Sequence, residues 1–340
     1  MTDDQVLVTG GTGFLGTHAI AQLVQAGYRV RTTVRTLGRE DEIHQSLARA
    51  GLQGRIDLEL VVADLSEDVG WAEAVEGVRY VLHLASPFPP AVPQDDDEVV
   101  VPARDGALRV LRAARDAGAE RVVLTSSFAA VGYGHAPTDR EFTEEDWTNG
   151  EAPLGAYIRS KLVAERAAWD FVAAEGGSLE LSVVNPVGIF GPPLTADLSS
   201  SIGLARQLIT AMPAVPRLAT TVVDVRDAAD LHLRAMTSPE AAGERFLAST
   251  GEPLAFREVA RILREAVGQE NAAPDVLDDD VVREAAKTDP GTATMLTELG
   301  RVRRVSSAKA RTVLGWRPRS DVETLQATAH ALRDLGLLES

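Results

Sequence analysis

The stretch Thr9-Gly10-Gly11-Thr12-Gly13-Phe14-Leu15-Gly16 decides the fold of this chain. It follows the apolar run 5–9, which has the character of a buried strand, and it opens the helical pattern 14–26. We predict that Gly10 allows a tight turn, that Gly13 lets a pyrophosphate approach the backbone amides, and that Gly16 permits close helix–strand packing. The spacing therefore predicts a dinucleotide cradle at this corner, with Phe14 and Leu15 in the first helical turn beside it.

Outward from this corner, strand-like runs alternate with helical patterns over residues 1–185. Nearly continuous apolar runs are typical of buried parallel strands, which right-handed helical crossovers connect. We expect strands at 5–9, 29–34, 58–62, 79–84, 121–126 and 179–185, and helices that include 14–26, 95–117 and 153–175. This order predicts an α/β fold, a Rossmann-type doubly wound parallel sheet.

The amino-acid composition changes after Asn185, where proline and glycine become frequent. A short helical stretch, a strand and further helices are expected at 199–211, 222–225, 226–237, 256–267 and 306–337. We expect a dinucleotide-binding domain made of residues 1–185 plus about 222–250. A smaller, mostly helical substrate-binding lobe would comprise about 186–221 and 251–340. The acidic clusters 95–97 and 278–280 are interpreted as solvated helix starts.

Composition narrows the class of protein. The chain has 340 residues, of which 45% are hydrophobic and 25% charged, as in ordinary globular proteins. Its net charge of −16 argues against a nucleic-acid partner. No apolar run approaches the length of about 18 residues that a membrane span needs. The chain has no cysteine, so we expect no disulfide and no thiolate metal site, and no other metal is predicted. The acidic N-terminus lacks the character of a secretory signal, and we expect a cytoplasmic monomer or homodimer.

The end of the second strand predicts which dinucleotide is bound. Proteins specific for NAD usually carry a carboxylate there, for the ribose hydroxyls. This chain has Arg35, with Arg39 one turn beyond, and guanidinium groups suit a 2′-phosphate. We therefore predict NADP(H). Asp64 and Leu65 close the third strand, where a carboxylate can accept from the adenine amino group. Ala85 follows the fourth strand and is expected beside the cofactor ribose.

A tyrosine and a lysine four residues apart carry the predicted chemistry. Tyr157 and Lys161 would lie on one helical face, and the ammonium charge favours the phenolate form. Lysine occurs at only two other positions, 287 and 309, in a chain rich in arginine. A serine at the end of the fifth strand could hold a carbonyl oxygen beside Tyr157, which protonates the developing alkoxide. Alternation along the strand favours Ser127 over Ser126, whereas His83 is interpreted as a packed strand residue.

These residues lie in motifs that resemble those of the extended short-chain dehydrogenases/reductases. Within that family, the chain is similar to the dihydroflavonol reductases, the cinnamoyl-CoA reductases and the fungal methylglyoxal (aldehyde) reductases. The matching segments are TGGTGFLG (9–16), ADL (63–65), HLASPF (83–88), LTSS (124–127), YIRSK (157–161), NPVGIFGP (185–192), VDVRDAA (223–229) and LGWRP (314–318), with the arginine at 35. The resemblance implies a catalytic set of Ser127, Tyr157 and Lys161, and a contact of Pro186 and Val187 with the nicotinamide carboxamide.

The resemblance also implies a substrate class. It implies NADPH-dependent reduction of an aldehyde or ketone, reversible as an alcohol dehydrogenase, with Phe88 and Phe128 lining the substrate pocket. We interpret Gly188 as widening that pocket. Residues 129–132 lack the asparagine of flavonoid-specific relatives, which argues against a flavonoid substrate.

Two other functions are compatible with the same motifs. One is a sugar-nucleotide epimerase or dehydratase, which the arginine at position 35 disfavours. The other is a non-catalytic NADP-binding sensor, which the retained Tyr157 and Lys161 pair disfavours.

Overall fold

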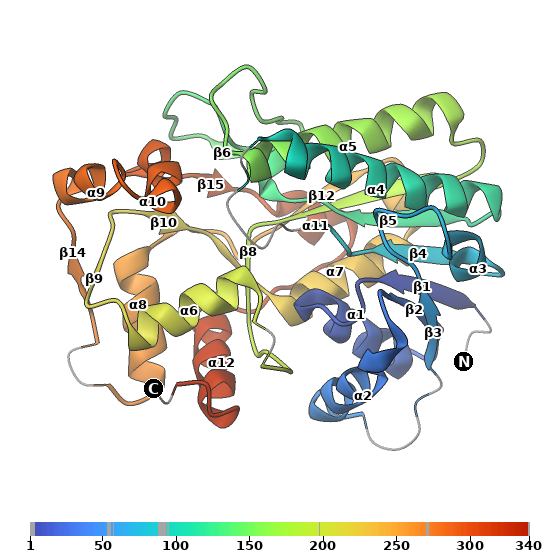
Figure 1. The fold of residues 1–340 in the computed structure, drawn as a ribbon, viewed down its shortest axis with the longest axis horizontal. Helices are drawn as coiled ribbons and strands as arrows, with labels where there is room; N and C mark the ends of the chain where they lie inside the picture. The colour runs from blue at the N-terminus through green and yellow to red at the C-terminus, as the bar shows by residue number, and fades with distance from the viewer. Residues whose placement is uncertain are drawn as a thin grey trace.

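A computed structural model describes residues 4–52, 56, 58–87, 93, 95–196, 198–269 and 272–338. A seven-stranded sheet forms its centre, in the order β12-β7-β5-β4-β1-β2-β3, and all of its neighbouring strands run parallel (Figure 1). The order reverses direction beside β1, as in a doubly wound sheet. The strands are β1 (Gln5–Thr9), β2 (Arg29–Val34), β3 (Leu58–Val62), β4 (Tyr80–His83), β5 (Arg121–Thr125), β7 (Glu180–Pro186) and β12 (Arg245–Ala248).

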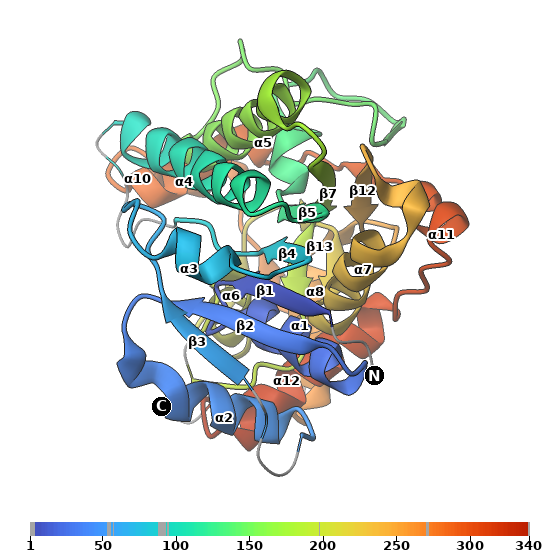
Figure 2. The same cartoon turned by 90° about the vertical axis from the view of Figure 1, so that its right-hand side faces the viewer.

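Helices cover both faces of this sheet (Figures 1 and 2). One face carries α3 (Trp71–Val75), α4 (Asp97–Asp116) and α5 (Ala156–Glu175), and the other carries α1 (Phe14–Gln25), α2 (Glu40–Arg49) and α7 (Val225–Thr237). A separate apolar cluster fills the space between the sheet and each helical layer. The predicted Rossmann-type α/β fold is therefore confirmed.

A second group of helices has its own core. Helices α6 (Ser200–Thr210), α8 (Phe256–Ala266) and α12 (Asp321–Asp334) pack together around a third apolar cluster (Figure 1). Short strands join this region in pairs: β8 (Gly188–Phe190) with β11 (Val222–Asp224), β9 (Ala214–Val215) with β14 (Asp275–Val276), and β10 (Ala219–Thr220) with β13 (Leu254–Ala255). The remaining helices are α9 (Asp279–Ala285), α10 (Pro290–Met295) and α11 (Ala308–Val313), with 3₁₀ turns η1 (Leu37–Arg39), η2 (Phe128–Ala130), η3 (Pro239–Ala241) and η4 (Leu296–Glu298).

The C-terminal part of the chain does not stay within that second group. Strand β15 (Arg304–Val305) pairs with β6 (Glu141–Phe142), in the loop that follows β5. Further on, Trp316 is fully buried in the cluster beneath α1 and α7, and its Nε1 donates to the carbonyl of Asp227 over 2.9 Å. The sequence-based division assigned all of 251–340 to the smaller lobe. We retain the two-part organisation as a proposal, with 304–316 packing on the sheet half.

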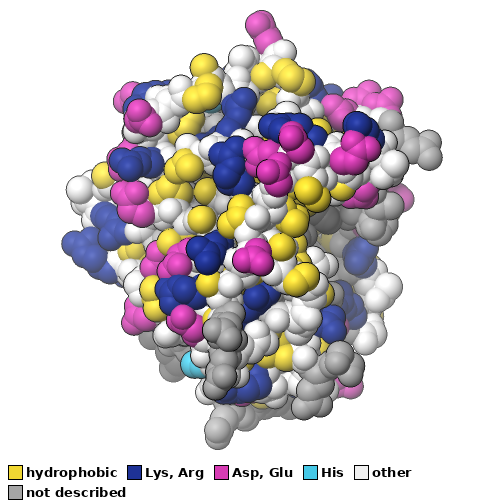
Figure 3. Space-filling model, turned by 90° about the vertical axis from the view of Figure 1, so that its left-hand side faces the viewer, with side chains coloured by type: hydrophobic (Ala, Val, Ile, Leu, Met, Phe, Trp, Pro, Cys, Tyr) yellow, Lys and Arg dark blue, Asp and Glu magenta, His cyan; other side chains and the backbone are white. Residues whose placement is uncertain are grey.

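Helix starts and surface charge follow the sequence pattern. Helix α4 begins at Asp97, and the Asp278 side chain caps α9 by accepting from the backbone N–H of Asp280, so both acidic clusters open helices as predicted. Basic and acidic side chains are interspersed over the face in Figure 3. Among the described helices, none is long and apolar enough to cross a bilayer.

Candidate active site

The glycine-rich turn after β1 has the geometry of a cradle. Gly10 has a φ of 74°, a conformation that favours glycine, and a Cβ there would lie 3.0 Å from the Cα of Ala85. A Cβ on Gly16 would lie 2.1 Å from the carbonyl oxygen of Gly10, so the helix start packs directly on the turn. Gly13 differs, because it is exposed and its Cβ would meet only that same oxygen, at 3.2 Å. The open side of Gly13 lies at the N-terminus of α1, where the amides of Phe14 and Leu15 begin the helix. This cradle fits a pyrophosphate.

Two alanine substitutions should separate the packing glycine from the cradle glycine. Gly16→Ala is expected to lower the free energy of unfolding by about 1–3 kcal/mol, because its methyl group clashes with backbone. Gly13→Ala should change stability by less than about 0.5 kcal/mol yet weaken dinucleotide binding, because its methyl group fills the open side. Thermal denaturation and equilibrium binding of NADPH would measure the two effects. Equal losses of binding and stability in both variants would contradict the distinction.

The corner after β2 brings arginines to the same turn. Arg35 is exposed immediately after β2, and Arg39 ends η1. The Arg39 guanidinium donates to the hydroxyl of Thr12 over 3.3 Å and forms two 2.7 Å hydrogen bonds with the Glu42 carboxylate. That pairing lowers the pKa of Glu42. A 2′-phosphate at this corner would thus meet Arg35 directly and compete with Glu42 for Arg39.

Removal of the competing carboxylate should strengthen binding of NADPH. We expect Glu42→Gln to lower the Kd for NADPH by between about two- and fivefold, because a partly exposed ion pair contributes about 0–1 kcal/mol. Binding of NADH should change less, since it has no 2′-phosphate. Asp41→Asn removes the same charge from a neighbouring exposed position and serves as the control. A Kd for NADPH that is unchanged, or lowered equally by both substitutions, would refute the competition.

The end of β4 lies beside the glycine turn, whereas the end of β3 lies beyond β2 in the sheet. The Asp64 carboxylate accepts from the hydroxyl and backbone N–H of Ser66 over 2.7 and 2.8 Å, and these contacts lower the pKa of Asp64. The hydroxyl of Thr9 accepts from the N–H of Ala85 and contacts Nδ1 of His83 at 2.8 Å. Burial lowers the pKa of His83 to about 3, so its ring is neutral. His83 therefore joins the ends of β1 and β4, which agrees with its interpretation as a packed strand residue.

The two serines after β5 have different surroundings. Ser126 is buried, and its hydroxyl donates to the Glu165 carboxylate over 2.5 Å. Ser127 caps η2, where its Oγ accepts from the N–H of Ala129 over 3.1 Å. This contact does not use the Ser127 hydroxyl proton, which can be donated. Helix α5 packs against η2, so the two elements that carry Ser127 and Tyr157 adjoin.

Tyr157 and Lys161 lie in the first turns of α5. The Tyr157 side chain is 43% exposed, and the Lys161 ammonium lies 5.8 Å from the centre of its ring. Lys161 Nζ also donates to the Ser86 hydroxyl over 3.0 Å, a partner that the sequence did not predict. Ser86 belongs to the loop that follows β4. The lysine therefore lies between the tyrosine and the loop that carries Ala85.

The predicted nicotinamide and substrate contacts lie at the end of β7. Pro186 ends this strand, and the N–H of Val187 donates to the carbonyl of Ala248 over 3.1 Å. Gly188 begins β8, and a Cβ there would lie 3.1 Å from the Phe190 ring and 3.2 Å from the carbonyl oxygen of Thr221. Close pairing of β8 with β11 thus gives this glycine a packing role, and its effect on pocket width stays a prediction.

The aromatic residues expected at the substrate are placed unequally. Phe88 lies outside the described residues. Phe128 is only 7% exposed, and its ring packs on those of Phe142 and Tyr133, with centroids 5.8 Å away in each case. Its ring is therefore packed among aromatic side chains, and its contact with the substrate stays a prediction. Tyr133, which the sequence did not single out, is partly buried, and burial raises its pKa.

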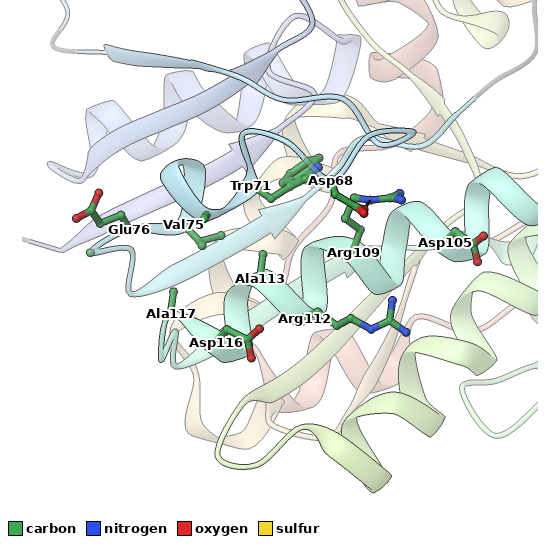
Figure 4. A pocket seen from close by; sticks show the side chains of 12 residues that line it. Asp68, Trp71, Val75, Glu76, Asp105, Arg109, Arg112, Ala113, Asp116 and Ala117 are labelled. Carbon is green, nitrogen blue, oxygen red and sulfur yellow. Dashed lines mark hydrogen bonds and ion pairs between the residues drawn. The ribbon is translucent and has the colours of Figure 1, made fainter.

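A separate groove lies away from these residues. A cavity of about 870 Å³ runs between α3 and α4, with Trp71, Arg109 and Arg112 among its lining residues (Figure 4). Arg109 pairs with Asp68 there and donates to the carbonyl of Leu65. None of the proposed catalytic residues lines this groove. Among the described residues, no cluster of three or more histidine and carboxylate side chains could hold a metal ion.

Comparison with known proteins identifies the class. The profile of the NAD dependent epimerase/dehydratase family matches residues 6–248. The chain therefore belongs to this family, the extended short-chain dehydrogenases/reductases.

Individual relatives are reductases. The chain is 34% identical over 268 residues to a cinnamoyl-CoA reductase of Medicago truncatula, which covers 76% of this chain and 80% of that enzyme. It is 31% identical over 284 residues to the NADPH-dependent methylglyoxal reductase of Saccharomyces cerevisiae, covering 76% and 82%. The crystal structure of a yeast methylglyoxal/isovaleraldehyde reductase complexed with NADPH superposes with a TM-score of 0.80 at 26% identity, over 98% of this chain and 99% of that one.

Proposed function

We propose that this chain is an NADPH-dependent carbonyl reductase that reduces aldehydes or ketones and can run in reverse as an alcohol dehydrogenase. The broader class is that of NADP-dependent oxidoreductases, in keeping with its family and with its relatives. The observation that carries the proposal is that Tyr157 and Lys161 lie together in the first turns of α5, a helix that packs against the η2 turn capped by Ser127.

The residues that would hold NADPH come from five strand ends. The glycine turn would bind the pyrophosphate, and Arg35 and Arg39 the 2′-phosphate. Asp64 and Leu65 would contact the adenine, Ala85 the ribose, and Pro186 and Val187 the nicotinamide. The parallel strands place all of these at one edge of the sheet, as expected for the carboxyl ends of a doubly wound sheet. NADPH, when bound, supplies the hydride.

Side chains of the protein would orient and protonate the carbonyl oxygen of the substrate. The Ser127 hydroxyl, whose oxygen already accepts from the N–H of Ala129, would donate a hydrogen bond to the carbonyl oxygen and orient it. The Tyr157 hydroxyl would give its proton to the oxygen as negative charge develops there. The Lys161 ammonium, 5.8 Å from the Tyr157 ring centre, would stabilise the phenolate that remains. Phe88, Phe128 and Gly188 remain candidates for contact with the substrate.

Consumption of NADPH across a substrate panel tests this proposal. Purified protein would be given aliphatic aldehydes, aryl ketones, α-ketoesters and diketones, with NADH in parallel. We expect turnover with NADPH and far less with NADH, and the ranking of compounds would map the pocket. Tight binding of NADPH with no turnover of any compound would instead favour a sensor.

A further inference from the structure

A buried carboxylate lies two helical turns beyond Tyr157. Glu165 is on the same helix, four residues after Lys161, and its side chain is fully buried. It accepts hydrogen bonds from Ser126 Oγ at 2.5 Å, Asn185 Nδ2 at 2.7 Å and Arg245 Nε at 2.6 Å. These donors come from the ends of β5 and β7 and from the start of β12. One carboxylate therefore joins three sheet segments to α5.

Two of these donors adjoin residues assigned to the reaction. Ser126 precedes Ser127 in the chain, and Asn185 precedes Pro186, the first of the two proposed nicotinamide contacts. Asn185 Nδ2 also donates to the backbone carbonyl of Ser127 over 3.2 Å. Glu165 thus fixes the serine turn through two routes, one through Ser126 and one through Asn185.

Arg245, the third donor to Glu165, is itself held in place by its neighbours. The Arg245 guanidinium lies 3.8 Å above the Trp147 ring and donates to the carbonyls of Glu144 and Asp146 over 2.8 Å each. A buried ion pair is often no more stabilising than apolar residues of similar volume. Stability is therefore a weak reason for a charged pair here, and the hydrogen bonds of Glu165 with Ser126 and Asn185 point to a role in orientation.

We propose that Glu165 is a positioning residue that sets the Ser127 turn against Tyr157 and Lys161. This inference rests on the proposed carbonyl reduction. Glu165 has no contact with substrate in this account, and it acts through Ser126 and Asn185. Its loss should therefore lower kcat while the binding of NADPH, which the glycine turn and arginines provide, stays nearly constant.

Two double variants isolate this effect. Glu165→Gln with Arg245→Met keeps one oxygen that can accept from Ser126 or Asn185, whereas Glu165→Leu with Arg245→Met keeps none. Both remove the buried charges together, so neither leaves an unpaired ion in the core. We expect the leucine version to lose roughly 10- to 100-fold in kcat, with the Kd for NADPH little changed, and the glutamine version to keep most of its kcat. Equal kcat in both double variants would overturn the proposal.

A matched pair at the far end of the same strands serves as the control. Arg121, at the start of β5, pairs with Glu180, at the start of β7, over 2.5 Å. Glu180→Gln is expected to lower thermal stability and leave kcat unchanged. If the leucine double variant does not fold, Asn185→Leu takes its place, with the same fall in kcat expected. Wild-type kcat in that variant would refute the positioning role.

Hydrogen exchange separates this inference from the proposed function. Exchange at the backbone amides of 127–131 should be faster in the leucine double variant than in the glutamine version or in Glu180→Gln. If the wild-type protein reduces no carbonyl compound, the proposed function fails, and the hydrogen-exchange comparison alone tests whether Glu165 fixes the serine turn. Unequal exchange would then support the fixed serine turn, and equal exchange would overturn it.

Discussion

Tyr157→Phe is expected to lower kcat by roughly 10²- to 10⁴-fold, the range typical of a lost general acid. The substitution removes one hydroxyl group from a ring that is 43% exposed, and it leaves the hydrophobic contacts of that ring in place. Binding of NADPH should therefore stay within about twofold of the wild type. Steady-state kinetics with the best substrate of the panel and fluorescence titration with NADPH would measure the two quantities.

The same chemical change at the other end of the sheet provides the control. Tyr80 lies at the start of β4, and its hydroxyl donates to Glu120 over 3.3 Å. Tyr80→Phe should leave kcat unchanged, because it lies far from the ends of the strands that carry the site. Unchanged kcat in Tyr157→Phe would show that this residue is not the acid. Loss of both folding and NADPH binding would show that it is structural.

Arg35→Asp should reverse the choice of cofactor. A charge-assisted hydrogen bond to phosphate contributes about 1.5–3 kcal/mol, so we expect kcat/KM with NADPH to fall roughly 10- to 100-fold. The new carboxylate would also repel the 2′-phosphate and could accept from the ribose hydroxyls of NADH. Activity with NADH should thus be kept or raised, and the preference should move from NADPH toward NADH.

Position 29 offers a control on the same strand. Arg29 is exposed at the start of β2, whereas Arg35 follows its end. Arg29→Asp makes the same change in net charge, so it measures the effect of charge on the protein as a whole. If both variants show one common ratio of NADPH to NADH activity, Arg35 does not bind the 2′-phosphate.

The sequence predicts the sheet half of the molecule best. The strands β1, β3 and β5 are mostly apolar runs, and the glycines mark the corner after β1, so local pattern is sufficient there. The pairing of β6 with β15 is different. Each strand has two residues, and the paired positions, 141–142 and 304–305, lie far apart in the sequence. Such pairings depend on tertiary packing and leave no periodic signal.

The candidate site shows the same limit. Gly10 and Tyr157 lie in motifs whose spacing is local. Glu165 lacks such a motif, because its partner Arg245 lies 80 residues away and its burial depends on the folded sheet. One signal could have indicated it, since positions 157, 161 and 165 repeat at intervals of four and so share a helix face. Phe128 shows a related limit, because the sequence does not reveal that its ring packs on Phe142, which lies in the following loop.

Transfer of a deuterium label tests the central claim most directly. NADPH that carries deuterium at both positions of C4 of the nicotinamide would be incubated with the purified protein and the best carbonyl substrate, and the alcohol would be analysed by mass spectrometry and NMR. The account predicts that the label appears on the carbinol carbon of the product, and that Tyr157→Phe suppresses its transfer. An alcohol without the label, or transfer that is equally fast in Tyr157→Phe, would contradict the account.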